Sequence, residues 1–581
     1  MKKIYRYLLV GTAFMLTYTS CNFLDHDPQG TLDGDLAENQ VEALVTSAYS
    51  ALGNDHYDKP FSLWPYGNVR SDDAYKGGND INDIATFHYY ETSQNIQTTF
   101  SEPNDLWYYC YVAISRTNQA LAALENTTTE KFPNKDIRMG EMYFIRGHFY
   151  FMLKELFGHI PFVDETVLLD NYDNIDNKLS NDDQWAWICN DFEKAYSLLP
   201  ETKKEVGRAD KYAAAAYLAK ARLYKAYRQD EKNSVTEINA DDLKEVVKYA
   251  DIVLNSGIYG LEYDIAYNFL PGSYENGKES VFAIQYSKDD GTMFGRLNWG
   301  DVLSVPMGLG CCDFHKPSQN LVNAFKTDAS SGLPQFDTYN DKDYDVSTSA
   351  ADPRLFHTVA IPGLPYKYNQ ELIYEEGWNR NPTVYGYYAS LKENVDPTCD
   401  CFVNVSPFYG NTKNRIVLRY ADVILMKAEA LIELNRAGEA LPLINQIRER
   451  AKRSTTFTNY APNMKISVYE PGKNCTWTTD FARQALRWER RLEFAMEGSR
   501  FFDLVRWGIV SDVINNYYST EASKRSYYSS ARFTKNKNEY LPIPNQQIVF
   551  VNGIYKQNYG CLLYTSPSPR DLSTSRMPSS A

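Results

Sequence analysis

Residues 416–451 read IVLRYADVILMKAEALIELNRAGEALPLINQIRERA and place apolar residues at steps of three and four in two successive runs. This periodicity predicts one helix over residues 416–435 and a second over residues 437–452. Small Ala428 and Ala440 lie on the two facing helices, and their size lets the helices approach closely. We therefore expect a tightly packed helix pair with a short connection.

The same periodicity continues outside this pair. Apolar residues recur at helical spacing in further segments, namely residues 105–125, 136–157, 181–199, 208–228, 241–255 and 478–507. Between residues 258 and 415 the pattern fails, because Gly, Pro, Asn and Asp interrupt short runs such as SVFAIQY at 280–286, which predicts a strand. The sequence therefore predicts a mainly α fold: a tetratricopeptide-like helical scaffold with a long loop-rich insertion and a few short strands.

The first residues predict a secretory signal. Three basic residues precede an apolar run at residues 8–16, which is shorter than the ~20 residues that a helix needs to cross a bilayer. Cys21 follows, and the pattern around it resembles a bacterial lipobox, although Tyr18 stands where a strict lipobox has Leu. We expect residues 1–20 to be removed and Cys21 to carry lipid. The alternative is an ordinary cleavable signal with a free cysteine nearby.

Residues 561–581 read CLLYTSPSPRDLSTSRMPSSA and lose the hydrophobic periodicity. Their composition is that of a disordered tail, but back-translated they resemble sequencing-adapter read-through, so we expect the native chain to stop near Gly560. Without residues 1–20 and 561–581, the 60 basic and 74 acidic residues fall to 55 and 73, a net charge of −18. Such a surface repels phosphate backbones, which argues against a nucleic-acid partner.

The chain shows no strong metal or cofactor motif. Two cysteines are adjacent at 311–312 and two form CxC at 399–401, and neither spacing is that of a zinc finger or a thioredoxin site, so their pairing stays open. The seven histidines are scattered, without an HExxH motif. Aspartates at 341–352 follow a calcium-loop rhythm, but Val346 replaces the turn glycine. We expect no metal and no cofactor.

Residues 486–508, LRWERRLEFAMEGSRFFDLVRWG, concentrate charge on a predicted helix. Glu493 and Glu497 are one turn apart, which is roughly the carboxylate spacing of a retaining glycosidase. A glycosidase needs one of these acids protonated, however, and neighbouring Arg490 and Arg500 are expected to keep both ionised. We favour a structural ion network and keep an all-helical glycoside hydrolase as an alternative.

Several motifs together resemble the SusD/RagB family of outer-membrane glycan-binding lipoproteins from Bacteroidetes. The matching stretches run in family order, at residues 140–163, 207–224, 351–359, 416–451, 489–508, 540–548 and 556–560. They include GRADKYAAAAYLAKARLY at 207–224, and KQNYG at 556–560 is similar to the family's terminal motif with Tyr559 replacing a proline.

The resemblance implies an all-helical, right-handed, tetratricopeptide-like scaffold with a loop-rich face. It implies one SusD-like domain over residues 21–560, made of an N-terminal helical part (21–257), an insertion (258–415) and a C-terminal helical part (416–560). It also implies a lipid anchor at Cys21 that holds the protein on the outside of the outer membrane. The implied partner is a SusC-like TonB-dependent transporter, over which the protein sits as a hinged lid that delivers oligosaccharide.

Sugars bind by stacking their C–H faces on aromatic rings while polar groups fix the hydroxyls. This chain has 46 Tyr and 9 Trp, and two loop stretches, residues 64–78 and 285–300, combine such rings with polar residues and resemble the regions that line the family's pocket. The ligand-binding residues that we predict there are Arg70, Asp73, Tyr75, Tyr286, Phe294, Arg296, Asn298 and Trp299. The alternative is that Trp64 and Trp299 only plug the insertion onto the scaffold.

The leading function is therefore a non-enzymatic glycan-binding lipoprotein for nutrient import. A RagB-like scaffold that binds peptides or proteins is the main alternative, and the glycoside hydrolase is a further one. The sequence does not name the glycan, because the loops that contact it differ within one fold.

Overall fold

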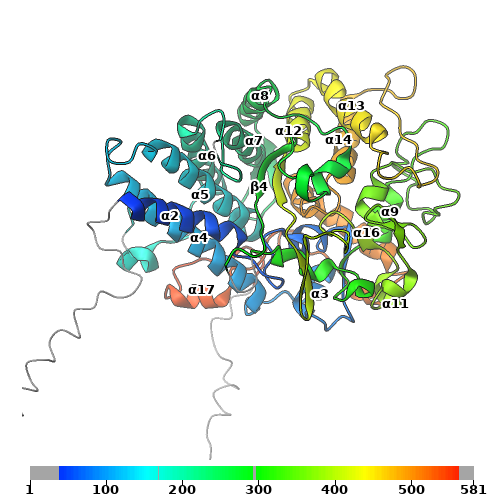
Figure 1. Ribbon diagram of the computed structural model, residues 1–581, viewed down its shortest axis with the longest axis horizontal. Helices are drawn as coiled ribbons and strands as arrows, with labels where there is room; N and C mark the ends of the chain where they lie inside the picture. The colour runs from blue at the N-terminus through cyan, green and yellow to red at the C-terminus, as the bar shows by residue number, and fades with distance from the viewer. Residues whose placement is uncertain (1–37, 168, 204, 292–295, 562–581) are drawn as a thin grey trace, which may run out of the picture.

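The computed structural model describes residues 38–167, 169–203, 205–291 and 296–561 (Figure 1). The predicted lipid-attachment residue Cys21, the predicted ligand contact Phe294 and the segment 562–581 lie outside the described residues.

An array of helices forms most of the molecule (Figure 1). Its members are α4 (Ser101–Glu125), α5 (Lys135–Phe157), α6 (Asn181–Leu198), α7 (Lys211–Ala226), α8 (Ala240–Leu254), α12 (Tyr420–Glu433), α13 (Ala437–Arg453) and α14 (Thr479–Glu493). Neighbours along the chain pack together, and α8 packs against α12, so the array continues across the insertion. This arrangement confirms the predicted mainly helical scaffold of tetratricopeptide-like helix pairs.

Small residues allow the helices of this array to approach closely. Ala216 of α7, Ala428 of α12 and Ala440 of α13 are all 0% exposed, as expected for residues at helix contacts. The start of α7 is fixed by a side-chain cap, because the Asp210 carboxylate accepts a hydrogen bond from the backbone N–H of Ala213. The predicted pair at 416–451 is therefore present, with α13 beginning at Ala437.

The strands are short and form two-stranded antiparallel ribbons. The pairs are β1 (Ala74–Gly77) with β5 (Phe314–Pro317), β2 (Tyr227–Gln229) with β3 (Val235–Ile238), β4 (Ser280–Ile284) with β12 (Arg415–Arg419), β6 (Val359–Ala360) with β9 (Ala389–Ser390), β7 (Pro365–Tyr366) with β8 (Asn369–Ile373), and β10 (Phe402–Val405) with β11 (Phe408–Asn411). The β4 strand confirms the strand predicted at 280–286. Because β12 leads directly into α12, the β4–β12 ribbon ties the loop-rich segment to the helical array.

Shorter helices and turns complete the fold. They are α2 (Glu38–Ser50), α3 (Ala85–Thr92), α9 (Gln319–Ala324), α10 (Leu355–Thr358), α11 (Pro382–Tyr385), α15 (Arg500–Arg506), α16 (Val510–Glu521), α17 (Asn545–Phe550) and the turns η2 (Trp64–Asn68), η4 (Ile265–Phe269), η5 (Gly272–Tyr274) and η6 (Trp299–Ser304). The helices α2 and α16 lie outside the predicted segments. None of the helices in the described ranges is both long and apolar enough to span a bilayer.

Two predicted helices differ from the observed ones. The start of the predicted helix 416–435 is strand β12, and the predicted helix 478–507 is broken between α14 and α15. Within the break, between the end of α14 at Glu493 and the start of α15 at Arg500, Met496 has a φ of +64° and Gly498 a φ of +81°, which a right-handed helix does not contain. A methyl group at Gly67 would clash with the backbone oxygen of Gly498. The break thus lies where the backbone of the turn η2 packs against the backbone at Gly498.

Candidate functional site

The structure brings the two predicted ligand-binding stretches into contact. Trp64 donates its indole N–H to the carbonyl oxygen of Gly300 at 3.0 Å, and the Ser62 hydroxyl donates to the Asp301 carboxylate at 2.6 Å. Trp64 is only 1% exposed. Its indole thus ties the first stretch to the insertion, and the same side chain lines the cavity described below.

Three predicted ligand contacts in residues 64–78 lie in the interior. Arg70, Asp73 and Tyr75 are each at most 1% exposed. Arg70 donates to the backbone oxygen of Asn538 at 2.6 Å. The Asp73 carboxylate accepts from the Arg491 guanidinium at 2.9 Å, and the Tyr75 hydroxyl donates to the Glu521 carboxylate at 2.7 Å. These contacts tie the stretch to the C-terminal helices, so a ligand does not reach the three side chains in this structure.

The predicted contacts in residues 285–300 divide between interior and surface. Asn298 is 1% exposed, and its amide donates to the Asp301 carboxylate at 2.7 Å. Tyr286 is also buried. Arg296 and Trp299 are half-buried, which leaves part of each side chain open to a ligand. Among the described residues that we predicted to contact a ligand, Arg296 and Trp299 are therefore the two that remain accessible.

Trp299 belongs to a group of four rings, three of which lie outside the predicted ligand-binding residues. We call this group the Trp299 cluster; it comprises His56, Tyr57, Trp299 and Phe408, and all four are half-buried. The Trp299 ring stacks on His56 with centroids 5.7 Å apart and meets Phe408 edge-on at 6.2 Å. Tyr57 joins the group through Phe408, at 5.1 Å. The sequence identifies Trp299 as an aromatic residue in a polar loop. It does not identify the neighbouring rings, because they come from segments far apart in the chain.

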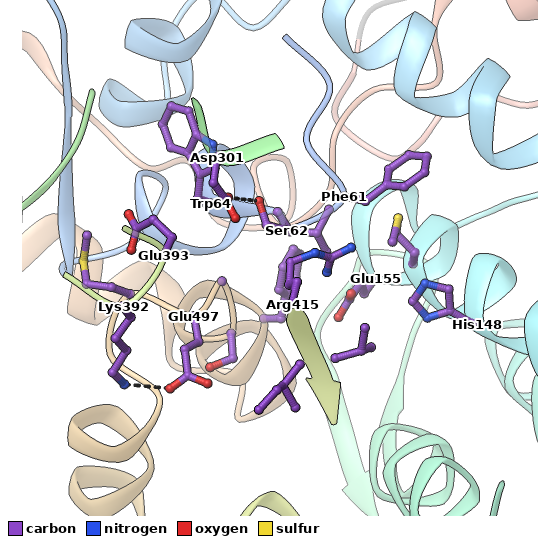
Figure 2. A pocket seen from close by; sticks show the side chains of 18 of the residues that line it. Phe61, Ser62, Trp64, His148, Glu155, Asp301, Lys392, Glu393, Arg415 and Glu497 are labelled. Carbon is purple, nitrogen blue, oxygen red and sulfur yellow. Dashed lines mark hydrogen bonds and ion pairs between the residues drawn. The ribbon is translucent and has the colours of Figure 1, made fainter. Parts of the chain in front are cut away.

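Asp301, in the same turn as Trp299, lines a cavity of about 150 Å³ (Figure 2). The cavity lies where the helical array, the insertion and the α14–α15 junction meet, and Figure 2 shows Arg415 extending from its strand among the lining side chains. Its acidic and basic lining residues, histidines included, are His148, Glu155, Lys220, Asp301, His315, Lys392, Glu393, Lys413, Arg415 and Glu497.

Burial shifts three titratable groups in and beside this cavity toward their neutral forms. It raises the pKa of Glu155 to about 8 and lowers the pKa of His148 to about 3. It also raises the pKa of Asp55 to about 6, against the attraction of Arg415. The Nε and Nη2 atoms of Arg415 and the Nε2 atom of His148 have no hydrogen-bond partner among the described residues. The cavity wall therefore carries unpaired polar atoms, chiefly hydrogen-bond donors, that can bind a polar group of a ligand.

Glu493 and Glu497 belong to a buried ion network, as predicted. Glu493 is 0% exposed and lies 2.9 Å from Arg419 and in contact with Arg450. Glu497 pairs with Lys392 at 2.6 Å and with Arg419 at 2.9 Å. Although burial opposes ionisation, the attraction of Arg450 and Arg419 holds the pKa of Glu493 far below its usual range. Glu493 is thus unsuited to act as a general acid, which argues against the pair proposed for a glycosidase.

The cations of this network differ from the predicted ones. Arg490 pairs with Asp422 and Asp503, each at 2.9 Å, and Arg500 pairs with Asp72 at 2.9 Å. The expectation that Arg490 and Arg500 flank the two glutamates was therefore wrong. The reason is the break after α14, because Arg500 lies on a separate helix and reaches the stretch that follows η2.

No group of three or more potential metal ligands occurs in the part of the chain that the structure describes. Within the calcium-like stretch 341–352, Asp352 is 1% exposed and pairs with Arg354 at 2.7 Å. The cysteines at 311–312 form one disulfide and those at 399–401 form another. Their sulfur atoms are thereby unavailable to a metal.

Two family models match the chain. The model described as the SusD family matches residues 278–560, and the model described as starch-binding, associating with the outer membrane, matches residues 22–223. A SusD-like protein of Formosa agariphila is 25% identical over 571 residues, which cover 93% of this chain and 96% of the relative.

Solved structures share the fold. A SusD-like protein from Bacteroides fragilis has a TM-score of 0.68 at 21% identity, with 91% of this chain and 98% of that chain covered. A structure named as a laminarin-binding SusD-like protein has a TM-score of 0.64 at 21% identity, with 90% and 99% covered.

Proposed function

This chain belongs to the SusD/RagB family, and from that membership we propose that it is a glycan-binding lipoprotein of the cell surface. It captures oligosaccharide outside the outer membrane and passes it to a SusC-like TonB-dependent transporter. The name of the laminarin-binding structure supports a carbohydrate ligand. We propose a binding role without catalysis, because Glu493 is locked in ion pairs.

The observation that carries this proposal is the Trp299 cluster. Its rings are half-buried, so they are fixed by packing and still present apolar surface to solvent. Such rings accept the C–H face of a sugar, and Arg296, which donates to Gly53 at 3.3 Å, supplies a polar group in the same segment. A rigid aromatic platform with a few polar groups at its edge is the usual form of a small-molecule site.

The lipid on Cys21 gives the partner proposal its physical reason. A capture protein that diffused away would lose its cargo before transport. Tethering both proteins to one membrane raises their effective concentration, so that even a weak contact with the transporter suffices. We expect Cys21→Ser, when expressed in the native host, to shift the protein from the membrane to the soluble fraction. Retention at the membrane without acylation would contradict the proposed anchor.

The direct test of ligand class is an array that carries both glycans and peptides, probed with the purified mature chain. We expect saturable binding to at least one class of polysaccharide and none to peptides. Binding to peptides alone would replace this proposal with the RagB-like alternative, and steady release of reducing ends from a bound polysaccharide would contradict the non-catalytic role.

A further inference from the structure

A second aromatic pocket lies on the loop-rich face. It has a volume of about 380 Å³, within the range of roughly 300–1,000 Å³ that small-ligand sites occupy. Its lining residues are Leu270, Pro271, Tyr274, Lys367, Tyr368, Asn369, Asp396 and Phe457. We call this pocket the tyrosine groove. None of these residues belongs to the Trp299 cluster or to the lining of the central cavity.

The groove is built from rings of three separate segments. Tyr274 is 38% exposed and lies against Tyr267, with centroids 5.0 Å apart. Phe457 stands edge-on to Tyr274 at 6.1 Å and lies 5.3 Å from Tyr368. Tyr267, Tyr368 and Phe457 are half-buried. The groove thus exposes aromatic ring surface to solvent, whereas most large aromatic side chains are buried in a folded protein.

One wall of the groove is held in place from behind. The Tyr368 hydroxyl forms a hydrogen bond with Nδ1 of His357 at 2.9 Å, and the Lys367 ammonium donates to the carbonyl oxygen of Leu391 at 2.5 Å. His357 is itself 0% exposed and bonds the backbone of Ser454. A ring fixed in this way loses little conformational entropy when a ligand stacks on it.

Two polar groups of the lining remain available. Asp396 Oδ1 accepts hydrogen bonds from the backbone and hydroxyl of Thr398, both at 2.8 Å, whereas its Oδ2 has no partner among the described residues. Asn369 Oδ1 accepts from the backbone of Glu371 at 3.0 Å, and its Nδ2 likewise has no partner in the described ranges. The lining therefore contains one free acceptor and one free donor, and groups of both kinds bond sugar hydroxyls.

Charge narrows the ligand further. Among the described lining residues Lys367 is the one cation, and it is 3% exposed with its ammonium turned to Leu391. The groove thus offers a carboxylate but no accessible positive charge. A sulfated or uronic polymer would face Asp396 without a counter-charge, which costs binding energy. A protein partner is also disfavoured, because the buried centre of an interface is depleted in charged residues.

We propose that the tyrosine groove is a second carbohydrate subsite, specific for uncharged sugar rings. One ring stacks on Tyr274 while Asp396 and Asn369 bond its hydroxyls. This inference rests on the proposed glycan-binding function but assigns a site that shares no residue with the Trp299 cluster. Two separate subsites let one long polysaccharide be held at two points, which strengthens retention through effective concentration.

Calorimetric titration of the mature chain tests the proposal. The probes are neutral hexasaccharides (laminarihexaose, maltohexaose, cellohexaose, xylohexaose and mannohexaose) and a sulfated fucan oligosaccharide. We expect Tyr274→Ala to lose one of two binding events or to weaken it about tenfold, which corresponds to about 1.4 kcal/mol. Asp396→Asn keeps the shape of the groove and is expected to weaken the same event. Tyr263→Ala, at a tyrosine 57% exposed outside the lining, is the matched control and should bind as wild type.

The outcomes separate this inference from the proposed function. If Trp299→Ala abolishes all sugar binding while Tyr274→Ala and Asp396→Asn bind as wild type, the groove proposal is overturned and the proposed function stands. If the sulfated fucan, rather than a neutral sugar, depends on Tyr274, the specificity for uncharged rings is overturned. If no probe and no array glycan binds wild type, both proposals fail.

Discussion

Residues 64–78 and residues 285–300 contain a similar mixture of aromatic and polar side chains, yet the fold uses them in opposite ways. In the first stretch Asp73 is 0% exposed and paired with Arg491 at 2.9 Å. In the second, Trp299 stays half-buried and stacks on rings of other loops. Such a mixture therefore marks a binding surface only where its side chains remain partly exposed after folding.

The largest effect is expected from breaking the buried pairs of the first stretch. Arg491→Met should lower the free energy of unfolding by about 3–5 kcal/mol, because Asp73 is left buried without its cation. Arg491 lies 2.9 Å from Asp73 and 3.1 Å from Asp72. Urea unfolding followed by circular dichroism measures the change. Arg436→Met is the control, since Arg436 pairs with Glu439 on the surface and its loss should be nearly neutral. Equal losses in both variants would contradict the comparison.

A slightly smaller effect is expected at the backbone contact that holds the first stretch in the interior. Gly67→Ala should cost about 3 kcal/mol, at the upper end for overpacking, because its methyl group meets the backbone oxygen of Gly498. Gly438→Ala is the matched control. It has open space around it and lies near the start of α13, where alanine is preferred, so stability should stay level or rise. A neutral Gly67→Ala would show that the contact with Gly498 is loose.

Acid should remove the contribution that Asp72 makes to stability. Although burial opposes it, the attraction of Arg491 and Arg500 lowers the pKa of Asp72 from 3.8 to about 2. A carboxylate whose pKa is lower in the folded state stabilises the fold above its unfolded pKa and loses that contribution as pH falls. The contribution is about 2 kcal/mol. The stability difference between wild type and Asp72→Asn should therefore be present at about pH 6 and shrink toward about pH 2. A difference independent of pH would contradict this assignment.

Substitution of Trp299, in residues 285–300, is expected to have the smallest effect on stability and a large effect on sugar binding. Trp299→Ala should weaken oligosaccharide binding about tenfold or more, because the stacking surface is lost, and leave the melting temperature nearly unchanged, because Trp299 is half-buried. Tyr108→Ala, which removes a ring 55% exposed on α4, serves as the control and should change neither quantity. A large drop in melting temperature with intact binding would make Trp299 a packing residue like Trp64.

The sequence predicts the helical array well and the candidate site only in part. The periodicity of α4 to α8 and of α12 to α13 is local, so it can be read without knowing the partners. The break after α14 lies where Gly498 packs against Gly67, a contact between distant segments that no local pattern contains. The burial of Asp73 likewise depends on Arg491, 418 residues away. For the same reason Phe408 could not be joined to Trp299 before the fold was known.

Oxidative footprinting with and without a saturating oligosaccharide reports which rings the sugar covers. We predict that Trp299 and Tyr57 are oxidised in the free protein and protected when sugar is bound, while exposed Tyr108 is oxidised equally in both. Unchanged oxidation of Trp299 under saturating sugar, with protection elsewhere on the molecule, would contradict the claim that the half-buried loop rings, rather than the buried stretch, meet the ligand.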